Sequence, residues 1–287
     1  MKKIFALFIA VALFHLPAYS IDTDPLDFVA GAPGVSVLGL YYGNWYSSQQ
    51  YFDGSQVGNN SIHSTYAVGN FVRFHNVGGY VLGTKIVIPV SNLNVLSPNG
   101  AASSGSGIGD PMLVFPLWLV NKPEKRTYFG IVPYLKLPLG QYDKNRVSPG
   151  ENRFALTLQP GFSTGLTEKL SLDLVGDVQF FGKNNDIAGE DGDLELERKP
   201  LFSMQGHLNY ELGPGFHLSI GAYKYIGGET KISGVSQSNR TDTNTVIAGF
   251  AYWITQRDNI SFQYRTDVSA QNGAKFNGLQ IRYLHAF

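Results

Sequence analysis

The chain has 287 residues, no cysteine, and 22 basic against 22 acidic residues, so its formal net charge is zero. This balance excludes the broad positive surface that nucleic-acid binding requires, and the lack of cysteine excludes both disulfides and a lipid-modified cysteine. With 16 tyrosines, 19 phenylalanines and 33 glycines, the chain is rich in strand-forming and turn-forming residues, which indicates an all-β protein.

The first twenty residues have the pattern of an export signal. Lys2 and Lys3 precede an apolar run over residues 4–14, and Ala18 and Ser20 are small residues near the end of the segment. The pattern predicts a signal peptide that is cleaved after Ser20. A membrane anchor is the alternative, but the run is shorter than the ~20 apolar residues that cross a bilayer. No later apolar stretch approaches that length, so the sequence excludes a helical membrane protein.

Residues 21–34 precede the first predicted strand and contain Pro25, Pro33 and two glycines. This composition does not favour a regular element. Two alternatives stay open: the segment folds as a short plug into the interior of the protein, or it is an N-terminal extension in the periplasm.

From residue 35 onward the dominant feature is alternation of apolar and polar side chains. Between residues 153 and 163, Phe154, Leu156 and Leu158 share one face, and Thr157 and Gln159 lie on the other. Successive side chains of a strand point to opposite faces, so this pattern predicts strands with one apolar and one wetter face. The predicted strands are residues 35–46, 62–75, 80–90, 110–120, 127–137, 153–163, 169–179, 202–211, 216–226, 244–254, 259–268 and 276–287.

The connections between these strands alternate in length. Short ones at 76–79, 121–126, 164–168, 213–215 and 256–258 separate long ones at 47–61, 91–109, 138–152, 182–200 and 227–243. Tight periplasmic turns and long outer loops are typical of outer-membrane barrels. The sequence therefore predicts a closed antiparallel up-and-down transmembrane β-barrel of about 12 strands over residues 35–287. A soluble β-sandwich would instead place its apolar faces inward.

The last predicted strand carries Leu279, Ile281, Tyr283 and Phe287 on one face, and the chain stops at the phenylalanine. We interpret Tyr283 and Phe287 as the signal that the barrel-insertion machinery reads. The expected partners are this machinery, outer-membrane lipid and a small-molecule permeant.

Several stretches resemble the family of exported barrels named for a putative MetA pathway of phenol degradation. They are residues 27–46 (DFVAGAPGVSVLGLYYGNWY), 107–120 (GIGDPMLVFPLWLV), 133–143 (PYLKLPLGQYD), 152–162 (NRFALTLQPGF), 170–184 (LSLDLVGDVQFFGKN) and 218–229 (LSIGAYKYIGGE). The resemblance implies an outer-membrane location and passive uptake of aromatic or other poorly soluble compounds. The alternatives are a nucleoside-type or sugar-type porin and a structural barrel without transport.

Charged and aromatic side chains on the inward face are the candidate site residues. Asp110, Lys136 and Arg153 fall near the outer mouth on neighbouring strands, where they either form a selective constriction or neutralise one another in a filled interior. Further inward charges are Asp173, Asp177, Arg265, Asp267 and Arg282, and inward rings that can stack a planar permeant are Tyr134, Tyr223, Tyr225 and Trp253.

Catalytic and metal sites have weak support in the sequence. The acidic stretch at 186–197 includes Asp186, Asp191 and Asp193, which are candidate calcium ligands, although their spacing does not fit the twelve-residue calcium loop. A solvated loop is the alternative. For an outer-membrane lipid hydrolase, His217 and Ser219 share a face, but that face points into the barrel rather than toward lipid. We therefore predict no catalytic residue and no cofactor.

Overall fold

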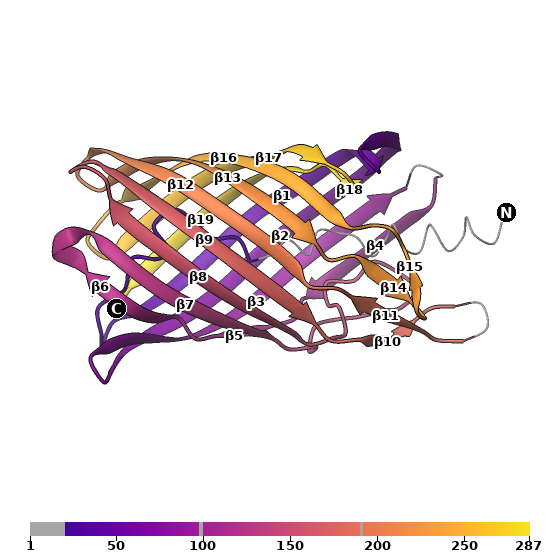
Figure 1. Cartoon of the computed structure of the whole chain (residues 1–287), viewed down its shortest axis with the longest axis horizontal. Helices are drawn as coiled ribbons and strands as arrows, with labels where there is room; N and C mark the ends of the chain where they lie inside the picture. The colour runs from indigo at the N-terminus through magenta and orange to yellow at the C-terminus, as the bar shows by residue number, and fades with distance from the viewer. Residues whose placement is uncertain (1–20, 98–99, 190–191) are drawn as a thin grey trace.

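The computed structural model describes residues 21–97, 100–189 and 192–287. Its main sheet is a closed barrel of 12 antiparallel strands (Figure 1), because the first strand pairs with both the second and the last. Closure matters in lipid, where each backbone group without a hydrogen-bond partner costs several kcal/mol. The predicted fold class is confirmed.

The barrel strands follow one another around the wall in chain order. Their bounds are β1 (Ser36–Phe52), β2 (Ser55–Val77), β3 (Tyr80–Leu96), β5 (Met112–Val114), β6 (Leu117–Lys122), β7 (Thr127–Lys136), β8 (Ala155–Gly165), β9 (Leu170–Phe181), β12 (Leu201–Gly213), β13 (Phe216–Gly227), β16 (Thr241–Trp253), β17 (Asp258–Ala270) and β19 (Asn277–Ala286). The short strands β5 and β6 together occupy one position between β3 and β7.

The predicted strand at 110–120 is interrupted at Phe115 and Pro116, which separates β5 from β6. Proline has no amide hydrogen to donate to the ladder, so regular pairing cannot continue through it. Single backbone bonds bridge the break: the Gly83 amide donates to the Pro116 carbonyl at 2.7 Å, and the Phe115 amide donates to the Pro133 carbonyl at 3.0 Å.

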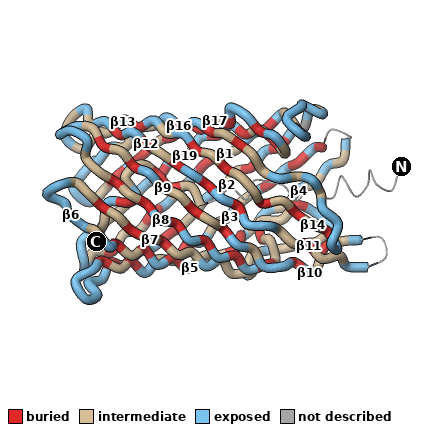
Figure 2. Tube along the Cα trace, viewed as in Figure 1, coloured by how far each residue is buried: buried red, intermediate tan, exposed pale blue. Residues whose placement is uncertain are grey.

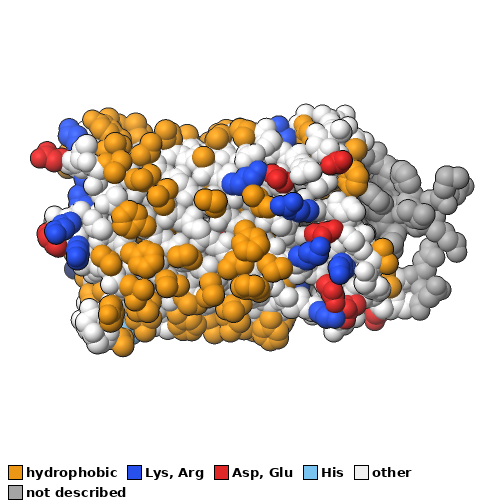
Figure 3. Space-filling model, in the orientation of Figure 1, with side chains coloured by type: hydrophobic (Ala, Val, Ile, Leu, Met, Phe, Trp, Pro, Cys, Tyr) orange, Lys and Arg blue, Asp and Glu red, His pale blue; other side chains and the backbone are white. Residues whose placement is uncertain are grey.

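The exterior of the barrel is apolar and its interior is polar. Met204 is 71% exposed and Phe202 53%, whereas Thr157 and Gln159 are at most 1% exposed. Buried and exposed residues alternate along the strands (Figure 2), and on the face shown in Figure 3 the charged side chains gather toward the two ends of the barrel. This inside-out arrangement suits hydrocarbon surroundings and argues against the soluble sandwich.

The short turns and the C-terminus lie at one end of the barrel, and the long connections lie at the other (Figure 1). The turn between β2 and β3 consists of Gly78 (φ 59°) and Gly79 (φ 88°). A two-residue hairpin needs positive φ at both central positions, which glycine adopts without a steric penalty. At the same end, the short 3₁₀ helix η1 (Pro123–Lys125) connects β6 to β7.

Two of the predicted long loops are wrong, because much of each continues as strand. β1 and β2 extend to a tight turn at Asp53 and Gly54, and β4 (Ala102–Ile108) prolongs the pairing of β3. The outward face of these extensions is no longer apolar, since it carries residues such as Asn92 and Asn94, and serine, asparagine and glycine then resemble loop composition. The alternation pattern therefore ends where the apolar exterior ends, although the ladder continues.

Two further long loops fold into a small second sheet at the long-loop end. Its strands are β10 (Asn184–Ile187), β11 (Leu194–Arg198), β14 (Thr230–Ile232) and β15 (Val235–Ser236). Ile187, Leu196 and Ile232 form its apolar core. A two-residue strand, β18 (Gly273–Ala274), pairs with the end of β1. In the part of the chain that the structure describes, there is no helix long and apolar enough to cross a membrane.

Candidate permeation pathway

Residues 21–34, here called the N-terminal segment, lie inside the barrel. The indole nitrogen of Trp118 donates to the Phe28 carbonyl at 2.8 Å, and the Tyr223 hydroxyl donates to the Thr23 carbonyl at 2.7 Å. The two donors belong to strands from different parts of the wall. Inward side chains thus hydrogen-bond to the backbone of the segment, which would otherwise carry unpaired polar groups.

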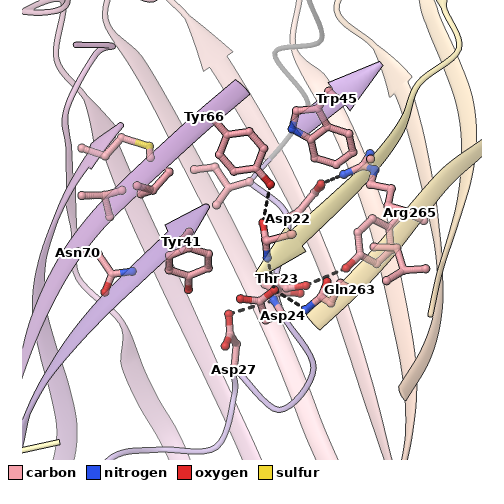
Figure 4. Close-up of a pocket in the computed structure, with 18 of the residues that line it drawn as sticks. Asp22, Thr23, Asp24, Asp27, Tyr41, Trp45, Tyr66, Asn70, Gln263 and Arg265 are labelled. Atoms are coloured by element: carbon pink, nitrogen blue, oxygen red, sulfur yellow. Dashed lines mark hydrogen bonds and ion pairs between the residues drawn. The ribbon is translucent and has the colours of Figure 1, made fainter. Parts of the chain in front are cut away.

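Ion pairs attach the acidic side chains of the N-terminal segment to basic residues of the wall. Nη1 of Arg282 lies 2.7 Å from Oδ2 of Asp24 and 2.9 Å from Oδ1 of Asp27. Asp24 also accepts a 2.6 Å hydrogen bond from Gln263 (Figure 4). Arg282 and Asp24 are both buried. A buried charge needs a partner of this kind, because removal from water alone costs several kcal/mol.

A second attachment joins Asp22 to the wall. Arg265 forms an ion pair with Asp22, and the Tyr225 hydroxyl donates to the same carboxylate (Figure 4 shows the arginine and the aspartate). Arg265 also donates to the Tyr225 oxygen at 3.0 Å and lies 4.8 Å from the ring of Trp45. Each of the three aspartates of the segment is therefore paired with an arginine that the alternation pattern had placed in the interior.

Phe28 fits against the wall at Gly161. A Cβ atom at position 161 would lie 2.1 Å from Cζ of Phe28, so only glycine permits this approach. The ring packs in a buried apolar cluster with Val87, Val114 and Val132. Val87 of this cluster also lines the inner cavity described below.

Two adjoining cavities lined by described residues lie inside the barrel. The inner cavity, about 200 Å³, lies beside the N-terminal segment and is lined by Tyr41, Tyr66, Asn70, Lys85 and Tyr134, among others (Figure 4). The outer cavity, about 470 Å³, lies on the long-loop side. Asp22, Trp45, Tyr66 and Arg265 line both cavities, so the two meet at the first residues of the N-terminal segment.

The three charges predicted at the outer mouth come together, and they do so around a residue that sequence reasoning missed. Lys136 Nζ lies 2.6 Å from Glu151 Oε1, and Arg153 Nη2 lies 2.6 Å from Glu151 Oε2. Asp110 accepts the Glu151 backbone amide at 2.7 Å. Burial alone would raise the pKa of Glu151, but Lys136 and Arg153 outweigh it and hold that pKa below its usual range. Glu151 lies in a predicted loop, where no periodic pattern marks a side chain as inward.

The remaining predicted acidic residues are bonded to polar neighbours in the interior. Asp173 accepts the Leu26 amide at 2.9 Å, and Asp177 accepts from Gln205 at 3.2 Å. Asp267 accepts from the hydroxyl of Thr245 at 2.6 Å and from a backbone amide near the outer cavity. Of these three residues, Asp173 bonds directly to the N-terminal segment, whereas Asp177 and Asp267 bond to other residues of the barrel.

Three of the four predicted stacking rings lie at the cavities or the N-terminal segment, and one does not. Tyr134 and Tyr223 line the inner cavity, and Tyr225 bonds to Asp22. Trp253 is 41% exposed and lines neither cavity. It is the last residue of β16, next to the turn that leads to β17, where the side chain is exposed to solvent.

The acidic stretch predicted as a cation site is neutralised by lysines. Lys144 lies 3.0 Å from Asp186 and 2.5 Å from Asp193, while Lys183 pairs with Glu195 and Glu197. The third candidate, Asp191, lies outside the described residues. Among the described residues, no group of three or more His, Cys, Asp and Glu side chains is placed to hold a metal ion.

The chain end takes part in closing the barrel. The Phe287 amide donates to the Ser36 carbonyl at 2.9 Å, and the Phe287 side chain is 61% exposed. The Tyr283 hydroxyl donates to Asp258 at 2.6 Å. Both aromatic side chains are therefore presented outside the barrel interior.

Solved structures resemble this barrel along its whole length. The COG4313 outer membrane channel from Pseudomonas putida F1 is 26% identical, with a TM-score of 0.88 over 93% of this chain and 100% of that chain. The transport unit of the autotransporter AIDA-I from Escherichia coli is 10% identical, with a TM-score of 0.56 over 100% of this chain and 99% of that chain. The TodX deltaS2S3 mutant monoaromatic hydrocarbon channel is 10% identical, with a TM-score of 0.50 over 92% of each chain.

These three structures are channels or transport units rather than enzymes. The first likeness and the apolar exterior together support an outer-membrane location. No curated protein matches the chain. A family model described as "Putative MetA-pathway of phenol degradation" matches residues 47–283, most of the sequence, and the chain therefore belongs to this family.

Proposed function

We propose that this protein is an outer-membrane channel for passive uptake of small aromatic or poorly soluble compounds, and that the N-terminal segment closes it. The observation that carries the proposal is the pair of adjoining cavities inside a closed barrel, separated from the short-turn end by residues of that segment. Cavities of several hundred Å³ with apolar walls and a few polar groups are typical of small-molecule sites.

The aromatic preference rests on the lining and on the family. Trp45 and Tyr66 line both cavities, and their rings stack with centroids 6.0 Å apart. Tyr134 and Tyr223 add two more rings to the inner cavity. Offset stacking favours planar aromatic guests over saturated ones. The family is named for phenol degradation, which agrees with such a permeant.

Export and assembly belong to the same proposal. Residues 1–20, which lie outside the described part of the chain, act as a cleaved signal peptide. Cleavage after Ser20 makes Ile21 the first residue, and its carbonyl accepts hydrogen bonds from Gln159 and Gln205 in the interior. The exposed Tyr283 and Phe287 serve as the signal for the barrel-insertion machinery.

Liposome swelling with the refolded protein tests the proposal. We expect phenol and aromatic acids to enter faster than sugars of equal size. Faster entry of nucleosides or sugars would indicate a porin of that type, and no swelling with any solute would indicate a structural barrel. Release of fatty acid from phospholipid in the same vesicles would indicate a lipid hydrolase, an outcome that contradicts the proposal.

A further inference from the structure

Two arginine side chains lie close to each other on the wall of the outer cavity. Arg153 and Arg198 both line it. Their guanidinium carbons lie 4.8 Å and 4.5 Å from the centroid of the same ring, Phe181. Arg153 comes from the start of the β8 region and Arg198 from the small second sheet. Two segments far apart in sequence thus bring two like charges to one place, which costs energy unless an anion lies nearby.

Glu151 neutralises only part of this charge. Arg153 donates to Glu151 Oε2 from Nε at 2.9 Å and from Nη2 at 2.6 Å, and Lys136 uses the other carboxylate oxygen. The third nitrogen of Arg153, Nη1, is buried and has no hydrogen-bond partner. A buried donor without a partner is destabilising, and structures rarely contain one without a reason.

The positive charge of Arg198 is less well neutralised by carboxylates than that of Arg153. Its Nε donates to the Gly228 carbonyl at 3.1 Å, and within the described chain no carboxylate lies within ion-pair distance of it. Burial and the neighbouring Arg153 lower the pKa of Arg198 to about 10, which still leaves it protonated at neutral pH. With Lys136, Arg153 and Arg198 set against Asp110 and Glu151, the group carries one surplus positive charge.

Apart from the Asp22–Arg265 ion pair and a few uncharged polar side chains, the remaining wall of the outer cavity is apolar and aromatic. Trp45 and Tyr66 stack with an interplanar angle of 13°, and Phe276, only 2% exposed, lies in the same lining. The volume of about 470 Å³ accommodates a single substituted benzene ring. A ligand that fits both parts of the wall has a planar ring and one negative group.

We infer that the outer cavity is a binding site for aromatic carboxylates, with the carboxylate at Arg153 and Arg198 and the ring against Trp45 and Tyr66. This inference rests on the proposed channel function and specifies its permeant. A guanidinium presents paired donors that match a carboxylate in a bidentate manner. Arg198 distinguishes the site from a purely structural network, because it makes neither an ion pair nor a hydrogen bond with Lys136, Glu151 or Arg153.

The test compares benzoate with benzamide, its neutral near-isostere, by calorimetric titration of the full refolded protein in detergent. We expect benzoate to bind at least about tenfold more tightly, since a charge-assisted hydrogen bond is worth that factor or more. Arg198→Gln should remove most of the difference. Lys199→Gln is the matched control, because Lys199 is the next residue, lines neither cavity and pairs with Glu229 at the surface.

Equal affinity of the native protein for benzoate and benzamide would overturn the inference, as would equal weakening by Arg198→Gln and Lys199→Gln. If Arg198→Gln does not fold, judged by its heat-modified gel mobility, the comparison of the two ligands on native protein still decides. Swelling with phenol separates the two proposals: a protein that passes phenol without preferring benzoate refutes only the inference, and one that binds benzoate but passes no solute refutes only the channel.

Discussion

Replacing Asp24 by asparagine should release the N-terminal segment while leaving the barrel intact. The Asp24 carboxylate accepts from Gln263 at 2.6 Å, from Gln280 at 3.0 Å and from Arg282 at 2.7 Å. Asparagine has the same size but no charge, and it presents a donor where these groups need an acceptor. Arg282 keeps its 2.9 Å contact with Asp27, so the substitution does not leave a buried cation alone.

The expected size of the effect follows from the contacts that are lost. A hydrogen bond to a charged group contributes ~1.5–3 kcal/mol, and the contact with Arg282 is of this kind. Because ~1.4 kcal/mol changes an equilibrium tenfold, the ratio of open to closed channels should rise about 10- to 100-fold. The ladder hydrogen bonds of the wall do not involve residue 24, so the stability of the barrel should change little.

Single-channel recording in planar bilayers measures this ratio directly. The control is Asp53→Asn, the same substitution at the exposed turn between β1 and β2, where the side chain contacts Gln271. We expect long open events for Asp24→Asn and native behaviour for the control. If native protein, Asp24→Asn and the control all show the same open probability, the N-terminal segment does not close the channel and the reasoning fails.

Three further predictions concern selectivity, packing and assembly. Lys136→Gln should shift the reversal potential in a salt gradient toward cation preference, because Glu151 then keeps only one of its two ion-pair partners. Gly161→Val should open the channel as Asp24→Asn does, because the valine side chain would occupy the space of the Phe28 ring. The conductance of the variant in planar bilayers measures this opening. Deleting Phe287 should lower the folded fraction in cell outer membranes but leave refolding in detergent unchanged, measured by heat-modified gel mobility.

Each of these predictions has an outcome that contradicts it. An unchanged reversal potential would remove Lys136 from ion selection. Gly176→Ala is the control for position 161, since a Cβ at Gly176 lies 3.8 Å from its nearest neighbour, and equal conductance of the two variants would show that Phe28 does not obstruct passage. Normal assembly without Phe287 in cells would mean that the insertion machinery reads another feature.

The features of this protein that depend on the bilayer can be predicted from the amino-acid sequence. Alternation of residues such as Phe154 and Thr157 reports directly on which face meets hydrocarbon, so strand positions, inward faces and the closed fold follow from it. The same pattern placed Asp110, Lys136 and Arg265 on the inward face, and in the structure Asp110 and Arg265 are buried and Lys136 pairs with Glu151. Where the outward face is no longer apolar, as in β4, the signal disappears and the extension of the strands was missed.

The residues that occupy the barrel interior could not be predicted in the same way, because long-range contacts place them there. Asp24 and Arg282 are 258 residues apart in sequence, and no local pattern connects an acidic residue in an irregular segment to a basic residue in the last strand. Glu151 and Arg198 likewise reach the outer cavity from segments without periodicity. The position of a wall residue around a closed barrel is set by strand order and register. The position of a loop or terminus is instead set by contacts with several strands at once. Those contacts exist only after the barrel has closed.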